Sequence, residues 1–453
     1  MNRFKILQVL ILIGLGILIY SNTFNSSFQF DDYDSIVSNL NIRNITHIKA
    51  IWSFWPNRFI TYLTVAFNYH FNQLNVFGYH LFNLLAHLIS ALLVWWFVLL
   101  TFSSPGMKNN KTTRYADSIA FFAALIFVAH PLQTQAVTYI IQRAACLAAL
   151  FYLGALCLYA KARILQYRAS GNTWKPYYIG SILMAALAMF TKEITITLPF
   201  MVLLYETYFF RTEKKINWKQ LIPFLALLLI IPSVMIATKS VNLAEMHRVS
   251  EAAPGIAPVN YLLTQFRVVV TYLRMAFVPF SQNVDYDYPL ANSLAQPQVF
   301  ISLILIAVIL IISFKIRSKY RLISFSIFWF FLVLLPESSI LPLADVIFEH
   351  RLYLPMAGYS IFLATVVYLL LEKRDIRITV ILLSIIVAFY STVAYSRNFY
   401  WKSEFSLWDD AIRKSPRKVR AYNERGIAYV RLGNYKKALD NFAMAISLNP
   451  DYL

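Results

Sequence analysis

The chain has 453 residues, of which 59% are hydrophobic and only 14% are charged, and its formal net charge is +19. A soluble protein of this length would carry about a quarter charged residues, so the composition excludes an ordinary soluble enzyme. Many apolar runs approach the roughly 20 residues that cross a hydrocarbon core, and such runs must be helical in a bilayer. The sequence therefore predicts an all-α, polytopic membrane protein, whose positive charge indicates basic residues retained on the cytoplasmic side rather than nucleic-acid binding.

The first apolar segment, residues 6–20, follows Arg3 and Lys5 and is predicted to be a retained span that starts in the cytoplasm. Residues 21–77 form a mixed, aromatic external loop. The region 239–297 contains an apolar segment at 261–280 that carries Arg267 and Arg274, so we expect an amphipathic helix along the interface there. Further spans are predicted at residues 78–102, 117–131, 144–160, 177–191, 195–210, 220–238, 298–314, 322–335, 355–371 and 378–396.

Basic residues indicate the orientation of these spans. Twenty of the 41 Lys and Arg residues lie in the N-terminus and in the connections 103–116, 161–175, 211–219, 315–321 and 372–377. The positive-inside rule places all six segments in the cytoplasm. The spans between them then cross in alternating directions only if the region 239–297 begins and ends on the same side of the membrane. We therefore predict about eleven spans in the cell inner membrane, with a cytoplasmic N-terminus and an external, periplasmic C-terminal tail.

The tail, residues 397–453, is polar and contains an internal repeat. Its residues Trp401, Phe405, Trp408, Ala411 and Pro416 recur 34 positions later as Tyr435, Leu439, Phe442, Ala445 and Pro450. This spacing is the tetratricopeptide period. We predict a membrane domain at 1–396 and a helical tail at 397–453 with about one and a half repeats, the full repeat covering 419–452. About three repeats are needed for an independent solenoid, so the tail is expected to lean on the membrane domain, a protein partner or a second copy.

Three carboxylates follow the first span closely, at Asp31, Asp32 and Asp34. Two interpretations are open. The carboxylates can cap a short juxtamembrane helix, or an ionised one can orient a reacting hydroxyl or take its proton. The second interpretation makes Asp31 and Asp32 the candidate catalytic residues.

Cations are expected on the same outer side, where Arg351, His350, Arg143 and Lys192 are candidates for binding a phosphate. Arginine suits bidentate phosphate binding better than lysine does. Simpler roles stay open: an interface position for Arg143, a local ion pair for Lys192 with Glu193, and a solvated loop for 349–351. Supporting roles are assigned to Glu193, Glu349 and Arg58. The other charged residues predicted on this side are Arg43, Lys49, Lys239, Arg248, Arg267, Arg274, Glu245, Glu251, Asp285, Asp287, Glu337 and Asp345.

Other chemistries lack their sequence patterns. The chain has only eleven glycines and no glycine-rich phosphate loop, which argues against ATP or dinucleotide chemistry. The spacing of histidines and acids follows no zinc pattern, so we expect neither a divalent metal nor another cofactor.

These motifs, taken in order, resemble the transmembrane-and-tetratricopeptide-repeat O-mannosyltransferases of the GT-C glycosyltransferase class, and most of all a bacterial relative of them. The resemblance covers nearly the whole chain and lies in residues 30–39, 57–64, 77–83, 130–143, 191–193, 336–339 and 349–355 and in the repeats.

The resemblance implies a polyprenyl-phosphate-linked, mannose-like sugar as donor and a hydroxyl of an acceptor protein or glycan on the external face. It makes Asp31 the general base of an inverting transfer, with a cation from Arg351, Arg143 or Lys192 stabilising the phosphate leaving group. Animal members carry many repeats, whereas this chain has about one and a half. The resemblance therefore does not extend to acceptor recognition through a long groove of repeats. Two alternatives remain: a non-catalytic scaffold whose tail recruits envelope-assembly partners, and a transporter of a lipid-linked sugar, although no symmetry between halves is evident.

Overall fold

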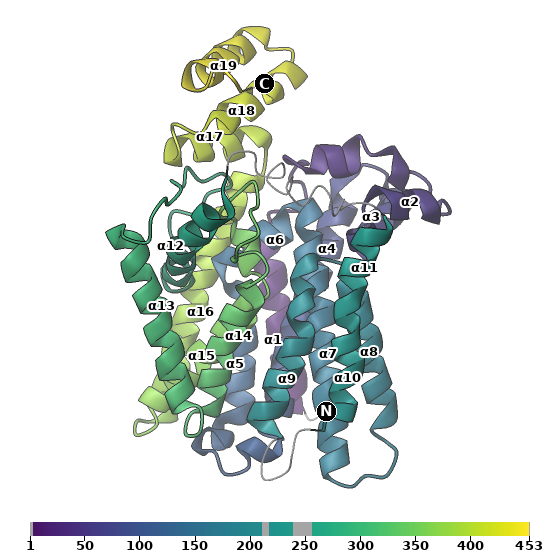
Figure 1. Cartoon of the computed structure of the whole chain (residues 1–453), viewed down its shortest axis with the longest axis vertical. Helices are drawn as coiled ribbons and strands as arrows, with labels where there is room; N and C mark the ends of the chain where they lie inside the picture. Colours follow the sequence, from purple (N-terminus) through teal and green to yellow (C-terminus); the bar gives the residue numbers. More distant parts are fainter. Residues whose placement is uncertain (1–2, 211–216, 239–255, 453) are drawn as a thin grey trace.

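The computed structural model describes residues 3–210, 217–238 and 256–452. Those residues form helices and connecting segments and contain no strand, which confirms the predicted all-α class. Figure 1 shows a bundle of long helices running alongside one another, with a small helical tail at one end and the N-terminus at the other. The predicted charges Lys239, Glu245, Arg248 and Glu251 lie outside the described residues.

Each predicted span is helical. Seven helical stretches among the described residues are long and apolar enough to cross a membrane, whereas α8, α9, α14 and α15 are shorter. The eleven-span topology therefore stays a prediction. The helices are α1 (Arg3–Tyr20), α4 (Val76–Phe102), α5 (Ala116–Ala129), α7 (Arg143–Tyr167), α8 (Lys175–Met189), α9 (Leu198–Phe209), α10 (Trp218–Ala226) continuing through a short turn into α11 (Ile230–Ala237), α13 (Pro297–Ile316), α14 (Arg321–Leu334), α15 (Pro355–Leu370) and α16 (Ile376–Asn398).

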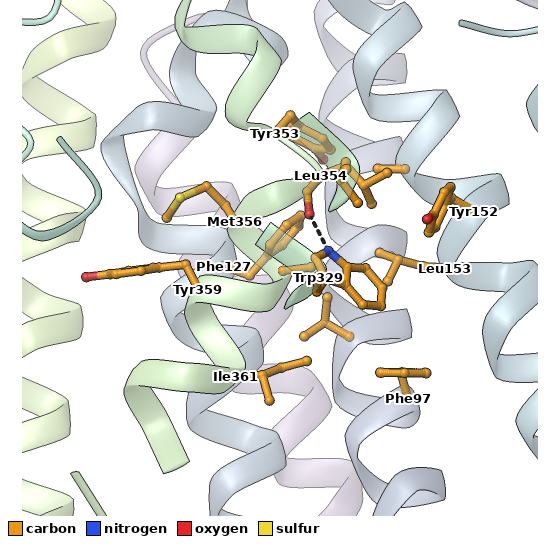
Figure 2. Packing of buried hydrophobic residues seen from close by; sticks show 14 of the residues in the cluster. Phe97, Phe127, Tyr152, Leu153, Trp329, Tyr353, Leu354, Met356, Tyr359 and Ile361 are labelled. Carbon is orange, nitrogen blue, oxygen red and sulfur yellow. Dashed lines mark hydrogen bonds between the residues drawn. The ribbon is translucent and has the colours of Figure 1, made fainter. Parts of the chain in front are cut away.

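The bundle core lies where α4, α5, α7, α14 and α15 meet. Trp329 of α14 is fully buried there, and Figure 2 shows its indole Nε1 donating to the Leu354 carbonyl at 3.0 Å. Gly358 of α15 lets the two helices approach, because a Cβ there would lie 2.8 Å from the Ser326 carbonyl oxygen. This packing fixes the chain directly after residues 349–352, which belong to the candidate site.

Different segments of the chain lie at the two ends of the bundle. The tail, α2 (Ile48–Phe54), α3 (Phe59–Asn72) and α6 (Thr134–Thr138) lie at one end, and the described parts of the basic connections lie at the other (Figure 1). The described parts of all six basic segments are therefore on one side, as the positive-inside argument requires. Which side faces the cytoplasm stays a prediction.

The segment predicted as an amphipathic helix forms α12 (Pro258–Phe277), toward the tail end of the bundle (Figure 1). Arg267 binds the Pro289 carbonyl at 3.1 Å and Arg274 is exposed. The buried face of α12 holds the loop between α14 and α15. Gln265 donates to the Val346 carbonyl at 2.9 Å. The Tyr272 hydroxyl accepts from the Phe348 amide at 3.0 Å and donates to the Phe348 carbonyl at 2.9 Å. The polar residues of α12 thus position residues 346–348.

The tail follows α16, which ends at Asn398, and its α-helices are α17 (Glu404–Lys414), α18 (Val419–Arg431) and α19 (Tyr435–Leu448). The helices α18 and α19 form the full repeat, and Gly426 makes room for Phe442, whose ring would lie 2.5 Å from a Cβ. The tail leans on the membrane domain, as expected: Arg397 at the end of α16 pairs with the buried Asp410 at 2.6 Å. Lys414 adds a bond to Asp410 at 2.6 Å.

We predict that Asp410→Ala undocks the tail, whereas Asp409→Ala, its exposed neighbour, does not. Removing Asp410 leaves the Arg397 guanidinium buried without a countercharge, which costs about 3 kcal/mol and corresponds to an increase of about 100-fold in the undocked population. Limited proteolysis of the tail in detergent measures this population. Equal cleavage rates for the two variants would contradict the prediction.

Candidate active site

Asp32 ties the first external loop to the segment before α7. Its carboxylate is fully buried and accepts from the Gln29 amide at 2.9 Å and the Ile141 amide at 2.7 Å. Burial raises the pKa of this carboxyl to about 8, although the two amide donors oppose the shift. Asp32 is therefore placed to fix the backbone next to Asp31 rather than to meet a substrate.

Asp31 is exposed and lies beside the hydroxyl of Tyr139. The Asp31 amide donates to that hydroxyl at 2.9 Å, and the hydroxyl also bonds the Asp31 carboxylate. The protein around Asp31 partly desolvates the carboxyl and raises its pKa, while Tyr139 and Arg420 act in the opposite direction. Of the two adjacent acids, Asp31 is the one that an outside hydroxyl can reach.

Arg58 and Glu193 form a bidentate pair across two loops, with the guanidinium Nε and Nη2 3.0–3.2 Å from the carboxylate oxygens. The guanidinium also lies 4.5 Å above the Trp55 ring. Burial disfavours the ionised Glu193, but Arg58 outweighs this effect and lowers its pKa. Arg58 and Glu193 thus form a partly exposed ion pair at the rim of the site.

Lys192 is buried and pairs with Glu337, whose Oε1 lies 3.4 Å from Nζ. Burial lowers the pKa of Lys192 while Glu337 raises it. The pair is not complete, because the buried Glu337 Oε2 and the neighbouring Ser338 hydroxyl lack a hydrogen-bond partner among the described residues. Buried polar atoms normally have partners, so these atoms mark a place suited to a polar ligand.

Arg351 is buried and donates to the carbonyls of Asp345 at 2.7 Å and Val346 at 3.2 Å. These bonds go to backbone oxygens, and within the described residues no carboxylate lies at ion-pair distance from Arg351, although the charges of Glu337 and Asp345 act on it. Because α12 holds residues 346–348, the direction of the guanidinium is set by packing as well as by its own bonds. A fixed guanidinium without a carboxylate partner can bind a phosphate oxygen.

His350 adjoins these cations. Its amide donates to Gln135 Oε1 at 2.7 Å, its ring stacks on Phe348 with 4.9 Å between centroids, and its buried Nδ1 has no protein partner in the described part of the chain. Burial, then the charges of Lys192 and Arg351, lowers the pKa of His350 well below its usual value. The imidazole is therefore neutral and can donate or accept a hydrogen bond.

Two other predicted residues are bonded within the protein. Glu349 is buried and accepts from Gln282 at 2.8 Å, and from the Asn283 amide and the Tyr286 hydroxyl at 2.6 Å each. Arg143 is fully buried, and its guanidinium donates to the Thr64 carbonyl at 3.2 Å and lies 4.6 Å above the Phe82 ring. Its Nε has no hydrogen-bond partner among the described residues, and phosphate binding by Arg143 stays a prediction.

The remaining candidates form one group. We call Arg58, Lys192 and Arg351 the cation group, because the charges of all three act on the neighbouring, neutral His350. Tyr62 connects this group to Asp31, because the charges of both Arg58 and Asp31 act on its hydroxyl. The arrangement places an exposed carboxylate beside buried cations, which suits proton removal on one side and anion stabilisation on the other.

The sequence argument missed Tyr62, Tyr139 and Arg420. Tyr139 and Tyr62 lie inside segments that were recognised, but nothing distinguished them from the other 27 tyrosines. Arg420 lies at the start of the repeat, where it reads as an ordinary surface position. Among the described residues no group of three His, Cys, Asp or Glu side chains is placed to hold a metal ion.

We predict that the contribution of Asp32 to stability falls between pH 5 and pH 8, so that wild type loses stability relative to Asp32→Asn as the pH rises through this range. The folded Asp32 keeps its proton up to a pKa of about 8, whereas an unfolded aspartate loses it near 3.9, so the folded state binds more protons in this range and loses stability as pH rises. The asparagine has no proton to lose. Melting temperatures in detergent at pH 5, 6, 7 and 8 check this, and parallel curves would contradict it.

A family model for the tetratricopeptide repeat matches residues 419–452, as predicted from the 34-residue spacing. Three relatives match along nearly the whole chain. They are protein O-mannosyl-transferases of Caenorhabditis elegans, 26% identical over 98% of this chain, Homo sapiens, 23% over 100%, and Drosophila melanogaster, 24% over 99%. No solved structure matches the chain.

The chain spans only 63%, 52% and 56% of the lengths of these three relatives. The matched part nevertheless includes the loop of Asp31, the cation group and the tail. The named relatives of this chain are therefore glycosyltransferases, as its resemblance to the O-mannosyltransferases led us to expect.

Proposed function

We propose that the chain is a membrane glycosyltransferase that moves a mannose-like sugar from a polyprenyl-phosphate donor to a hydroxyl of an acceptor protein or glycan on the external face. The names of the relatives support the transfer of mannose to protein. The observation that carries the proposal is the exposed carboxylate of Asp31 near the cation group, in which the buried Arg351 bonds backbone carbonyls instead of a carboxylate. A lipid bilayer around the helices supplies the donor, whose polyprenyl tail stays in the membrane.

On the acceptor side, Asp31 is the general base. Its carboxylate takes the proton of a serine, threonine or sugar hydroxyl while that oxygen attacks the anomeric carbon of the donor. The bond between this carbon and the phosphate oxygen breaks, the configuration inverts, and polyprenyl phosphate leaves. The buried Asp32 and the Tyr139 hydroxyl hold Asp31 in position for this step.

On the donor side, the cation group binds the phosphate. Arg351 offers a guanidinium whose own bonds go to carbonyls, and Lys192 adds an ammonium that Glu337 contacts through one oxygen at 3.4 Å. Negative charge on the phosphate increases as the glycosidic bond breaks, so these cations stabilise the transition state more than the bound donor. The neutral His350 can add a hydrogen bond. We expect the reaction to proceed in EDTA without a divalent metal.

The first test is sugar transfer in membranes that contain the protein, with radiolabelled polyprenyl-phosphate mannose. We expect Asp31→Asn to lower transfer by about 100-fold or more, because the amide cannot accept the proton. Asp34→Asn is the matched control, since Asp34 is exposed in the same loop, and it should keep activity within about twofold of wild type.

Transfer that is unchanged in a well-expressed Asp31→Asn variant would exclude Asp31 as the base. If wild type fails with mannose and with every other polyprenyl-phosphate sugar supplied, the glycosyltransferase proposal fails and a scaffold role is favoured.

A second prediction concerns the donor. Arg351→Ala should lower the transfer rate by about 100-fold, because a cation at the developing phosphate charge is lost, and Arg351→Lys should restore only part of it. Arg274→Ala, which removes an exposed arginine of α12, is the control. Initial rates at several donor concentrations measure the effect. Equal rates for the two alanine variants would exclude Arg351 from phosphate stabilisation.

A further inference from the structure

We propose that the helical tail completes the active site, with Arg420 of α18 as a positioning residue for both the loop of Asp31 and the loop of Arg351. The proposal rests on the function proposed above. It assigns to the tail a role in the reaction itself, beyond recruiting an acceptor or partner.

Arg420 joins two loops of the membrane domain. Its guanidinium donates to Asp285 through Nε at 2.9 Å and Nη2 at 2.6 Å, and to Asp345 through Nη1 at 3.0 Å and Nη2 at 2.6 Å. Asp285 is buried and is also reached by Lys418 at 3.3 Å, whereas Arg420 is the ion-pair partner recorded for Asp345 within the described residues. The fork geometry of arginine lets one side chain hold both carboxylates.

Asp345 transmits this contact to the donor side. Its carboxylate binds Arg420, and its backbone carbonyl accepts from Arg351 at 2.7 Å. One residue thus lies between the tail and the cation proposed to bind phosphate. Release of the Asp345 carboxylate therefore frees the carbonyl that orients Arg351.

The tail also acts on the residue before Asp31. Phe30 has a left-handed backbone with φ +44°, which is unfavourable for a residue with a large side chain and persists only when its surroundings impose it. Those surroundings are tail residues: the Phe30 ring meets Trp408 edge-on with 5.6 Å between centroids, and the Arg420 guanidinium lies 5.1 Å above it. The tail thereby holds the turn that presents Asp31.

The start of the tail approaches the other side of Asp31. Trp401 stacks on Tyr139, whose hydroxyl bonds Asp31, with 5.4 Å between ring centroids. The Ser27 amide donates to the Lys402 carbonyl at 3.2 Å. Tail residues therefore contact both neighbours of the proposed base, Phe30 and Tyr139.

The charge of Arg420 also reaches Asp31 and lowers the pKa of its carboxyl. The other titratable groups that face Asp31 or interact with it are Asp32, Asp34, Tyr62, Tyr139, Asp345 and Glu424. Among these groups Arg420 is the one that carries a positive charge. Its removal raises the pKa of Asp31, so the fall in activity on the acid side should move to higher pH.

The experiment compares Arg420→Ala, Arg420→Lys and the control Arg425→Ala in the full chain. Arg425 lies on the same helix but pairs with Asp409 and Asn441 inside the tail. We expect Arg420→Ala to lower kcat by about 100-fold through misplacement of the reacting groups and to shift the acid side of the pH profile upward. Arg420→Lys keeps the charge, so the pH profile stays while the rate falls. Arg425→Ala stays within about twofold of wild type.

Backbone hydrogen exchange of residues 28–32 and 343–351 gives a second readout that needs no activity. Both segments should exchange faster in Arg420→Ala than in wild type or Arg425→Ala. Unchanged exchange in both segments, or an active enzyme whose rate and pH profile are unaffected by Arg420→Ala, overturns the proposal. If wild type transfers no sugar, the proposed function fails, and the exchange data still decide whether the tail holds the two loops.

Discussion

A charge without access to water must find a partner, and this requirement organises the whole tail end of the molecule. The low dielectric of an apolar body makes an uncompensated buried ion costly. Asp410 therefore binds Arg397, and the buried carboxyl of Asp32, a polar group under the same constraint, accepts from two amides. The bond from the Ile141 amide to Asp32 joins segments 109 residues apart, so it also fixes the relative positions of two loops.

The cation group departs from this rule in an informative way. Among the described residues Lys192 has one ion-pair partner, Glu337, at 3.4 Å. Arg351 relies on carbonyl oxygens. Incomplete compensation beside an exposed carboxylate is typical of a binding site and not of a structural ion pair, because a ligand can supply the missing charge.

Much of the architecture could be predicted from the sequence because hydrophobic length and 34-residue periodicity report directly on helices. The candidate active site was harder to predict from the sequence. Asp31 and Asp32 are adjacent and identical in type, and only the fold shows that one is exposed and the other bonded to the amide of Ile141. Glu349 and Arg143 were predicted to take part in the chemistry, but in the structure their side chains bond other segments of the chain. Arg420 carried no signal, since a basic residue at the start of a repeat is common and its partners lie in other segments.

The same arrangement has a consequence for the order in which the protein is made. Phe30 emerges from the ribosome early, while Trp408 and Arg420, which hold its turn, emerge nearly four hundred residues later. Contacts between such distant segments form late, because a long loop must close before they stabilise anything. The membrane helices can insert one after another, but the site is assembled only when the last helix of the bundle has delivered the tail. If the proposed function holds, an incomplete chain in the membrane is thereby kept inactive toward the donor.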